Sequence, residues 1–90
     1  MKNVILILNA VEKEIERSYE NGFPLFNSSH EGIAIIREEF EELWDEIKDN
    51  KKENSYQLQI KEATHLAAMA IKFIDSIEKI IIDNKSRVKQ

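Results

Sequence analysis

Hydrophobic residues recur every three or four positions along three stretches of this sequence, which is the spacing of amphipathic α-helices. The first stretch covers residues 3–20, and its apolar stripe consists of Val4, Leu8, Val11, Ile15 and Tyr19. The opposite side is charged and is expected to face solvent; it carries Glu12, Lys13, Glu14, Glu16 and Arg17. Gly22 and Pro24 then end the helix. A short strand over residues 4–8 is the alternative, but the sequence offers no second strand to pair with it.

The connection after this first helix is too apolar to be a freely solvated loop. It contains Phe23, Leu25 and Phe26, which we expect to pack across the helix ends. Ser28 follows, and Glu31 lies three residues further on. This is the spacing of a capping box, in which the serine hydroxyl accepts from an unpaired amide and the glutamate returns the contact. A second helix is therefore predicted to begin here.

The second helix is predicted to continue to about residue 49, where charged and turn-forming residues interrupt the pattern. Its apolar stripe consists of Ile33, Ile36, Phe40, Leu43, Trp44 and Ile47. A tryptophan in this position is either a core residue or a stacking platform for a nucleobase. Because Leu43 and Ile47 lie beside it, we expect Trp44 to pack in the core.

The third and longest helix is predicted over residues 55–84, and it is apolar on two faces. The first face is expected to pack on the other helices and comprises Leu58, Leu66, Met69, Phe73, Ile77 and Ile80. The second face is rich in alanine and comprises Ile60, Ala63, Ala67, Ala70, Ile71 and Ile74. Since alanines let helices approach closely and a single chain leaves this face wet, we expect a homodimer interface. The predicted fold is all-α, with three main helices and a four-helix-bundle-like core completed by dimerisation.

Length and composition limit what such a chain can do. Ninety residues with 42% hydrophobic content suit a single domain, 1–90, with a packed core. A formal net charge of −4 argues against the phosphate attraction that drives nucleic-acid binding. Without cysteine, any metal must be held by oxygen or imidazole. The apolar runs are too short for a membrane span or a signal peptide, and we expect a cytoplasmic protein.

Candidate chemistry is concentrated in the second helix, where Glu38, Glu39 and Glu42 project from one flank. Such carboxylates are either an ordinary solvated face or oxygen ligands for Mg²⁺ or Mn²⁺. Glu62 in the third helix is more informative, because it falls on the apolar stripe, where an unpaired charge is costly. The carboxylate of Glu62 must pair with a basic side chain, lie at the solvent-exposed end of the core, or bind a metal ion shared with the second helix. Helical spacing alone does not decide among these three placements. The lysines of the third helix, Lys72 included, are expected to be solvated single charges.

The run Glu38-Glu39-Phe40-Glu41-Glu42 matches EExxE, the first half of the signature of the all-α nucleoside triphosphate pyrophosphohydrolases. This family contains MazG and the dimeric dUTPases, and its second half-signature, ExxD, follows in the next apolar helix. Here Glu62-Ala63-Thr64-His65 stands at a matching distance. The chain therefore resembles small MazG-like proteins over about residues 28–75. The departure is His65, which occupies the place of the family's aspartate.

The resemblance implies a reaction and a set of site residues. In the family, three glutamates and the aspartate hold Mg²⁺ ions that bridge the triphosphate, and water releases pyrophosphate and a nucleoside monophosphate. Carried over to this sequence, the implied metal ligands are Glu38, Glu39, Glu42, Glu62 and His65. The first three are also the candidates for the base that accepts a proton from water. The implied ion is Mg²⁺, with Mn²⁺ as the alternative.

His65 leaves more than one function open. Imidazole adds no negative charge and suits Mn²⁺, Zn²⁺ or Ni²⁺ better than Mg²⁺. It is a metal ligand, a donor to a phosphate, or a core histidine with both ring nitrogens satisfied. The chain is accordingly either a metal-dependent nucleotide pyrophosphohydrolase or a catalytically degenerate member of the same fold that binds a metal, a nucleotide or a protein. A helical interaction module without a site is the third interpretation.

Overall fold

The computed structural model describes residues 3–22, 24–49, 51 and 53–88, and regular secondary structure within these ranges is entirely helical. The elements are α1 (Val4–Glu20), α2 (Ser29–Lys48) and α3 (Ser55–Val88). The prediction of an all-α fold with three main helices is confirmed. α3 runs four residues past its predicted end, because no glycine or proline stops it and the basic Lys85 and Arg87 suit the negative end of a helix.

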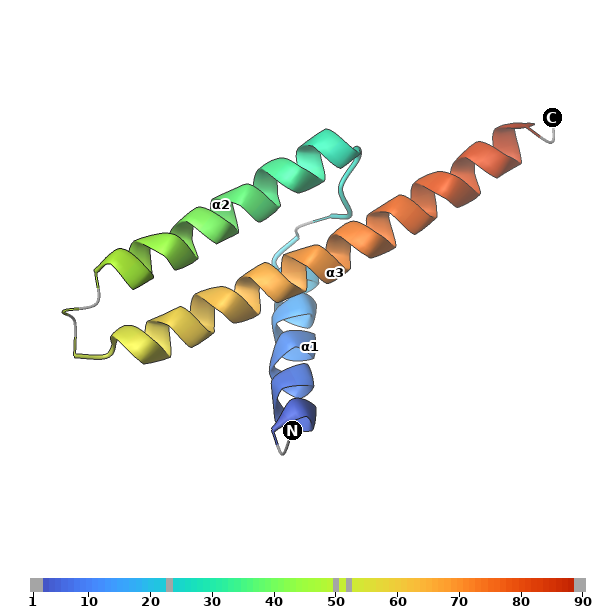
Figure 1. Ribbon diagram of the computed structural model, residues 1–90. Helices are drawn as coiled ribbons and strands as arrows, with labels where there is room; N and C mark the ends of the chain where they lie inside the picture. Colours follow the sequence, from blue (N-terminus) through green and yellow to red (C-terminus); the bar gives the residue numbers. More distant parts are fainter. Residues whose placement is uncertain (1–2, 23, 50, 52, 89–90) are drawn as a thin grey trace.

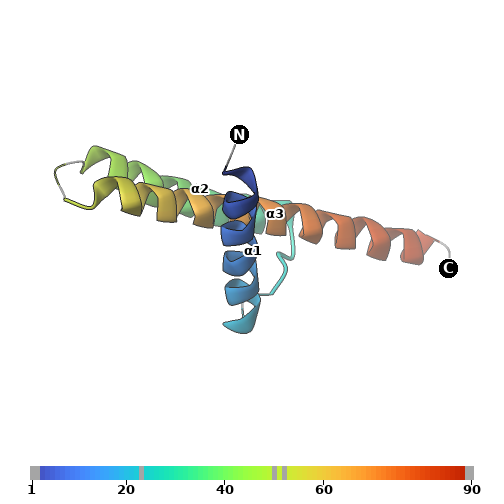
Figure 2. The same ribbon diagram turned by 90° about the horizontal axis from the view of Figure 1, so that it is seen from below.

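α2 and α3 lie side by side as an antiparallel hairpin, and α1 crosses α3 transversely (Figure 1). Among the described residues, the backbone of α1 comes close to α3 but not to α2. The C-terminal half of α3 projects beyond the hairpin, and the molecule measures 58 × 28 × 25 Å (Figure 2). Its radius of gyration of 15.8 Å exceeds the value of about 12 Å for a compact chain of this length. A single chain is therefore elongated and leaves much of its surface uncovered.

The helix ends follow from local sequence. Gly22 adopts a φ of +83°, a left-handed conformation that glycine takes without strain, and its amide donates to the carbonyl of Tyr19 at 3.0 Å. This turn ends α1. At the start of α2, the hydroxyl of Ser28 accepts a hydrogen bond from the amide of Glu31 at 3.1 Å, as the capping box predicts. The carboxylate of Glu31 accepts from the side-chain amide of Asn27 at 3.4 Å rather than from the amide of Ser28, so only the serine half of the predicted capping box is confirmed.

A small core forms where α1, the connection and the hairpin meet. Its buried residues are Val11, Phe26, Ala68 and Met69, and packed against them are Ile15, Ile35, Ile36, Ala67 and Phe73. The amide of Phe26 donates to the hydroxyl of Ser76 at 2.9 Å, which ties the connection to α3. The expectation that the connection packs across the helices is confirmed for Phe26. Phe23 lies outside the described residues.

Gly32 sets the distance between α2 and α3. A Cβ atom at this position would lie 2.5 Å from Cδ2 of Phe73 and 3.0 Å from Cδ2 of Phe26. A Cβ contact of 2.5 Å essentially never occurs, so a larger residue would force the ring of Phe73 or the helices themselves to shift. The close packing of α2 against Phe73 and Phe26 therefore depends on the missing side chain.

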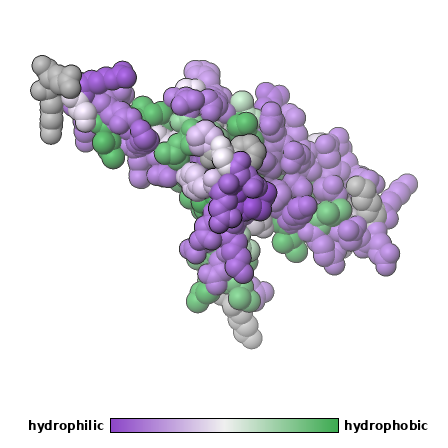
Figure 3. Space-filling model, turned by 180° about the vertical axis from the view of Figure 1, so that it is seen from behind, coloured by the Kyte–Doolittle hydropathy of each residue, from purple (hydrophilic) through white to green (hydrophobic). Residues whose placement is uncertain are grey.

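Large hydrophobic side chains remain exposed in the single chain. Phe40 and Trp44 on α2 are 57% and 49% exposed, so the expectation that Trp44 packs in the core is wrong for one chain. The reason is that α3 covers one side of the predicted stripe, and among the described residues the backbone of no other helix comes close to α2. Ile60, Ile71 and Ile74 of the second face of α3 are exposed as predicted, whereas Ala67 of the same face packs against the core. Hydrophobic side chains are also visible on the surface of the projecting α1 (Figure 3).

Candidate metal centre and adjoining pocket

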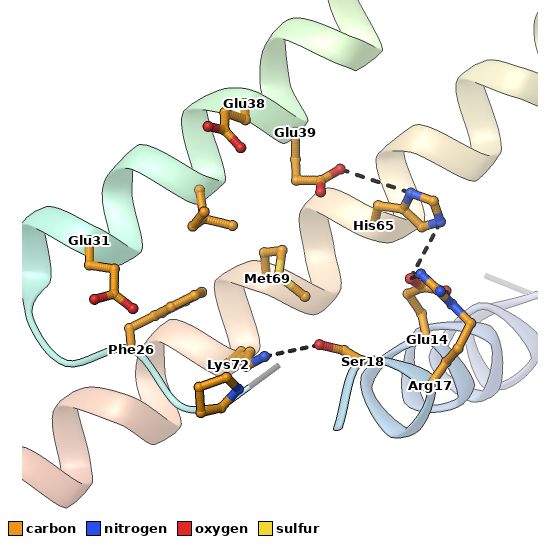
Figure 4. A pocket seen from close by; sticks show the side chains of 12 residues that line it. Glu14, Arg17, Ser18, Phe26, Glu31, Glu38, Glu39, His65, Met69 and Lys72 are labelled. Atoms are coloured by element: carbon orange, nitrogen blue, oxygen red, sulfur yellow. Dashed lines mark hydrogen bonds and ion pairs between the residues drawn. The ribbon is translucent and has the colours of Figure 1, made fainter. Parts of the chain in front are cut away.

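Three ionisable side chains from α2 and α3 converge near the point where α1 crosses α3. Glu39, Glu62 and His65 each offer one ligand atom, and these atoms lie within 4.8 Å of one another. Nδ1 of His65 is 3.5 Å from Oε2 of Glu62 and 3.9 Å from Oε2 of Glu39. Glu62 and His65 are three residues apart and so share one side of α3, while Glu39 reaches them from α2 (Figure 4). The two halves of the sequence signature thus meet at one point.

α1 adds a further carboxylate to this cluster. Oε1 of Glu14 lies 3.4 Å from Nε2 of His65, so that the two ring nitrogens face carboxylates from different helices (Figure 4). Arg17 donates from Nε to Oε2 of Glu14 at 3.0 Å and from its Nη2 to Oε1. This hydrogen bonding, against the opposing effect of burial, lowers the pKa of Glu14.

Glu14 was not among the residues predicted for the site, and its assignment to the solvent side of the first helix is wrong. It lies three residues after Val11, at the margin of the apolar stripe. Because α1 crosses α3 at the level of His65, this margin is turned toward the cluster. Helical spacing shows that Glu14 lies at the edge of the apolar stripe, but it does not show where α1 crosses α3. The sequence therefore contains no signal that separates Glu14 from its charged neighbours.

Nearby positive charge does not offset the burial and mutual repulsion of the Glu39 and Glu62 carboxylates. Burial, followed by repulsion from neighbouring carboxylates, raises the pKa of Glu39 to about 7. Burial, followed by the neighbouring carboxyl group of Glu42, likewise raises the pKa of Glu62. The Oε2 atoms of Glu39 and Glu62 are shielded from solvent and accept no hydrogen bond from the described part of the chain. Shielded acceptors without donors are costly, and a bound cation would relieve both the desolvation and the repulsion.

This donor set fits a divalent cation. Two carboxylates and one imidazole combine oxygen with nitrogen ligands, which Mn²⁺ and Zn²⁺ accept more readily than Mg²⁺ does. The shielded oxygens of Glu39 and Glu62 already lie within a few ångströms of Nδ1 of His65. The residues present are therefore compatible with a small metal ion, with Mn²⁺ as the better chemical match.

The other two predicted ligands occupy different places. Glu42 is exposed but lies near Glu39 and Glu62, close enough to contribute to the raised pKa of both. Glu38 is also exposed, and it lines the adjoining pocket and stands apart from the three convergent ligand atoms (Figure 4). The predicted set is thus divided among the cluster, its rim and the pocket.

A pocket of about 310 Å³ adjoins the cluster and shares Glu14, Glu39 and His65 with it. Its apolar lining is Pro24, Phe26, Ile35 and Met69, and its other polar residues are Arg17, Ser18, Glu31, Glu38 and Lys72. The pocket thus combines residues of α1, α2, α3 and the connection between α1 and α2. Such a concave site with mixed lining is the usual form of a small-molecule pocket.

Lys72 is the most unusual residue of this pocket, because it is only 2% exposed. Its Nζ donates to the hydroxyl of Ser18 at 2.9 Å and lies 5.0 Å from the ring centre of Tyr19 (Figure 4). Burial lowers the pKa of its ammonium group. The expectation that Lys72 is a solvated charge is wrong, since α1 and the connection cover this side of α3. No local pattern in the sequence indicates that α1 and the connection cover Lys72.

Comparison of the chain with models of protein families, with curated proteins and with solved structures finds no match. Within the described ranges, none of the helices is both long and apolar enough to cross a bilayer.

Proposed function

We propose that the protein is a metal-dependent nucleotide pyrophosphohydrolase, which converts a ribo- or deoxyribonucleoside triphosphate and water into the monophosphate and pyrophosphate. The observation that carries this proposal is the convergence of Glu39, Glu62 and His65, with shielded carboxylate oxygens that lack a donor among the described residues. These residues come from both halves of the signature that resembles the MazG-like family. Cleavage of a phosphoanhydride needs charge neutralisation and an oriented water more than a covalent nucleophile.

A divalent ion held by Glu39, Glu62 and His65 would supply positive charge beside the phosphate oxygens. Glu14 would orient the imidazole, because its carboxylate can accept the Nε2 proton and leave the lone pair of Nδ1 facing the other two ligands. Glu42 is exposed at the rim, where its carboxylate can meet an incoming water and accept its proton. The chain thus offers a separate residue for each task.

We also propose that the working form is a homodimer joined through the alanine-rich face of α3. In support of this, the large side chains of that face are exposed and the buried core of one chain is small. A second copy is the natural occupant, because two α2–α3 hairpins facing each other would form a four-helix bundle. Stable interfaces bury on the order of 1,200 to 2,000 Å². A helix of 34 residues, the length of α3, offers a face long enough for such an interface.

Product analysis tests the proposed reaction. The purified protein is incubated with a mixed pool of ribo- and deoxyribonucleoside triphosphates, with Mg²⁺ and separately with Mn²⁺, and monophosphates are separated by chromatography. We expect equal amounts of monophosphate and pyrophosphate, with more product in Mn²⁺, and the product identifies the base. Glu42→Gln should lower turnover at least about a hundredfold, which is the usual contribution of a general base.

The matched control for this experiment is Glu41→Gln. Glu41 is also exposed on α2, but it pairs with Arg37 on the other side of the helix. Its substitution should leave turnover unchanged. No product with either metal, or equal product from the wild type and Glu42→Gln, would contradict the proposed mechanism.

A catalytically degenerate member of the same fold is the alternative function, and the observation that favours it is the imidazole of His65 in place of a carboxylate. Such a protein would bind a divalent ion or a nucleotide without turnover. Binding to the folded state alone raises the melting temperature in proportion to the logarithm of ligand concentration. A rise in melting temperature with Mn²⁺, combined with the absence of product, would select this alternative.

A further inference from the structure

We propose that Arg17 and Lys61 bind a diphosphate or triphosphate group in a second cavity beside the metal centre, the polar cavity. This cavity measures about 490 Å³ and is lined by Glu14, Arg17, Lys61, Thr64 and His65. Its walls come from α1 and α3, and it shares Glu14 and His65 with the cluster. The inference rests on the proposed function, because it assigns residues of the same site to the phosphates of the substrate.

The guanidinium group of Arg17 is accessible and retains unused donors. Its side chain is 56% exposed, and within the described part of the chain its hydrogen bonds all go to Glu14. These bonds use Nε and Nη2, whereas a guanidinium group carries five N–H donors, so three of them remain. Because Glu14 holds the group at two nitrogens, the remaining donors keep a fixed direction beside His65 (Figure 4).

Lys61 supplies a second accessible cation from α3. It is exposed, and it forms no hydrogen bond or ion pair with the residues that the structure describes. After the hydrogen bond from Arg17, its positive charge is among the causes that lower the pKa of Glu14, which indicates that its ammonium group lies near the cluster. Arg17 and Lys61 therefore approach one cavity from two helices, and each has donors available for an anion.

The balance of charge distinguishes the polar cavity from the pocket that contains Lys72. Two permanent cations and one carboxylate line the polar cavity, and that carboxylate, Glu14, is engaged by Arg17. In contrast, four carboxylates and two cations line the other pocket. A phosphate chain is therefore attracted to the polar cavity and repelled from the other pocket. The planar fork of an arginine also suits the oxygens of a phosphate group.

The place of His65 favours an anion with more than one phosphate group. Its Nε2 faces Glu14 in the wall of the polar cavity, whereas its Nδ1 faces Glu39 and Glu62. An anion that contacts Arg17 and Lys61 and also reaches the metal ligands must extend past the imidazole ring. A chain of two or three phosphates has that length, and a single phosphate or sulfate group is shorter. We therefore expect the polar cavity to prefer the longer anions.

The composition of the chain makes the proposal measurable by NMR. Thr64 is the only threonine of the sequence and lines the cavity, so methyl-labelled threonine gives one signal that reports on it. The Nε–H signal of Arg17 is the second readout, and the other two arginines, Arg37 and Arg87, supply reference signals. The probes are inorganic pyrophosphate, triphosphate, orthophosphate and sulfate, added to the metal-free protein at constant ionic strength.

We expect the Thr64 and Arg17 signals to move with pyrophosphate and triphosphate at concentrations about tenfold lower than with orthophosphate or sulfate, because the longer anions contact both cations. Equal response to all four anions, or no response at Thr64 and Arg17, would overturn the proposal. A titration with uridine, which carries no phosphate, is the remaining arm. Movement of the Thr64 signal with uridine but not with pyrophosphate would assign the cavity to a base and would likewise contradict the proposal.

Lys61→Gln tests the second cation, and Lys85→Gln is its matched control. Both residues are exposed on α3, and Lys85 lies 24 positions further on, which is about 36 Å along the helix axis. Since Lys61 makes no contact that holds the described chain together, its variant should fold as the wild type does. We expect Lys61→Gln to weaken pyrophosphate binding about tenfold and Lys85→Gln to weaken it less than about twofold. Equal weakening by the two variants would mean that only the net charge matters, and the assignment of Lys61 would fall.

These titrations measure binding without turnover, so they can fail independently of the proposed reaction. Binding of pyrophosphate that depends on Lys61, in a protein that releases no monophosphate, would retain the anion site and remove the pyrophosphohydrolase function. Monophosphate release by a protein whose Thr64 and Arg17 signals respond to none of the anions would retain the reaction and remove the anion site.

Discussion

Glu39 couples the stability of the metal-free protein to pH. The pKa of its carboxyl group is raised from 4.5 to about 7 in the folded chain. Between these values the folded state binds the proton more tightly than the unfolded state, so the free energy of unfolding decreases as pH rises. The full shift corresponds to about 3 kcal/mol at 1.36 kcal/mol per pKa unit. Because 21% of the side chain is exposed, solvent screening reduces the expected effect to about 1 to 2 kcal/mol.

Urea unfolding at about pH 5 and about pH 8 measures this difference, with the metal-free protein more stable at the lower pH. Glu39→Gln should remove most of the difference and raise stability at the higher pH, because the buried negative charge is gone. Glu41→Gln, which changes an exposed glutamate on the same helix, should leave the difference intact. A pH dependence that is equal in wild type and Glu39→Gln would show that another group is responsible.

His65→Asp should change the preferred metal. The substitution adds a carboxylate to a cluster that already contains Glu14, Glu39 and Glu62, so the metal-free variant should melt at a lower temperature. It also provides an oxygen ligand, and Mg²⁺ should then raise the melting temperature more than it does in the wild type. Thermal unfolding with Mg²⁺ and with Mn²⁺ measures both effects.

The matched control is His30→Asp, which changes the other histidine of the chain, an exposed residue in the first turn of α2. It should leave the response to both metals as in the wild type. If His65→Asp responded to Mg²⁺ no more strongly than the wild type or His30→Asp, the role of residue 65 as a ligand would have to be abandoned.

At the scale of the helices, Gly32 links packing to the site. It precedes Glu39 by seven residues and so lies on the same side of α2, where Phe73 leaves no room for a Cβ atom. Gly32→Ala should lower the free energy of unfolding by about 1 to 3 kcal/mol through overpacking, even though alanine favours a helix. It should also weaken the stabilisation by Mn²⁺, because separating α2 from α3 moves Glu39 away from His65.

Chemical unfolding with and without Mn²⁺ tests this coupling. Ser29→Ala, at an exposed position in the first turn of the same helix, should alter neither quantity by more than about 0.5 kcal/mol. A stabilised Gly32→Ala variant would mean that the helices adjust freely and that the glycine does not set their separation.

Sequence periodicity predicts the helices well and their crossing poorly. The limits of α1 and α2 and the cap at Ser28 follow from local spacing. Met69 and Phe73 pack as predicted, but the most buried residues of α3, Ala68, Lys72 and Ser76, lie outside the predicted face. The convergence of Glu39 with Glu62 is one of three placements that helical spacing leaves open for Glu62, and it is the placement that the family resemblance implies. The sequence does not predict the transverse course of α1. This course depends on a few contacts around Val11 and Ile15, which any similar apolar stripe could make. Glu14 and Lys72 were missed for that reason.

At the scale of the whole molecule, the exposed face of α3 predicts self-association. Light scattering at micromolar concentration should give about twice the chain mass of 10.5 kDa. Ala70→Glu should convert this dimer to a monomer, because it places a charge on an exposed apolar face. Gln57→Glu, at an exposed polar position of the same helix, should remain dimeric. A monomeric wild type would remove the dimer proposal and leave the metal centre proposal unaffected.

Among the described residues, the backbone of α1 comes close to α3 and to no other helix, and this has a consequence for motion. Helices with few buried contacts open at lower free energy than the rest of a protein, and their amide protons exchange with solvent sooner. α1 and the α2–α3 hairpin should therefore behave as two cooperative units with different exchange rates. Undocking of α1 would carry away Glu14, Arg17 and Ser18 while Glu39, Glu62 and His65 stayed together on the hairpin. Each opening event would uncover Lys72 and admit water to the pocket, which gives a ligand a route in and out without separation of the hairpin.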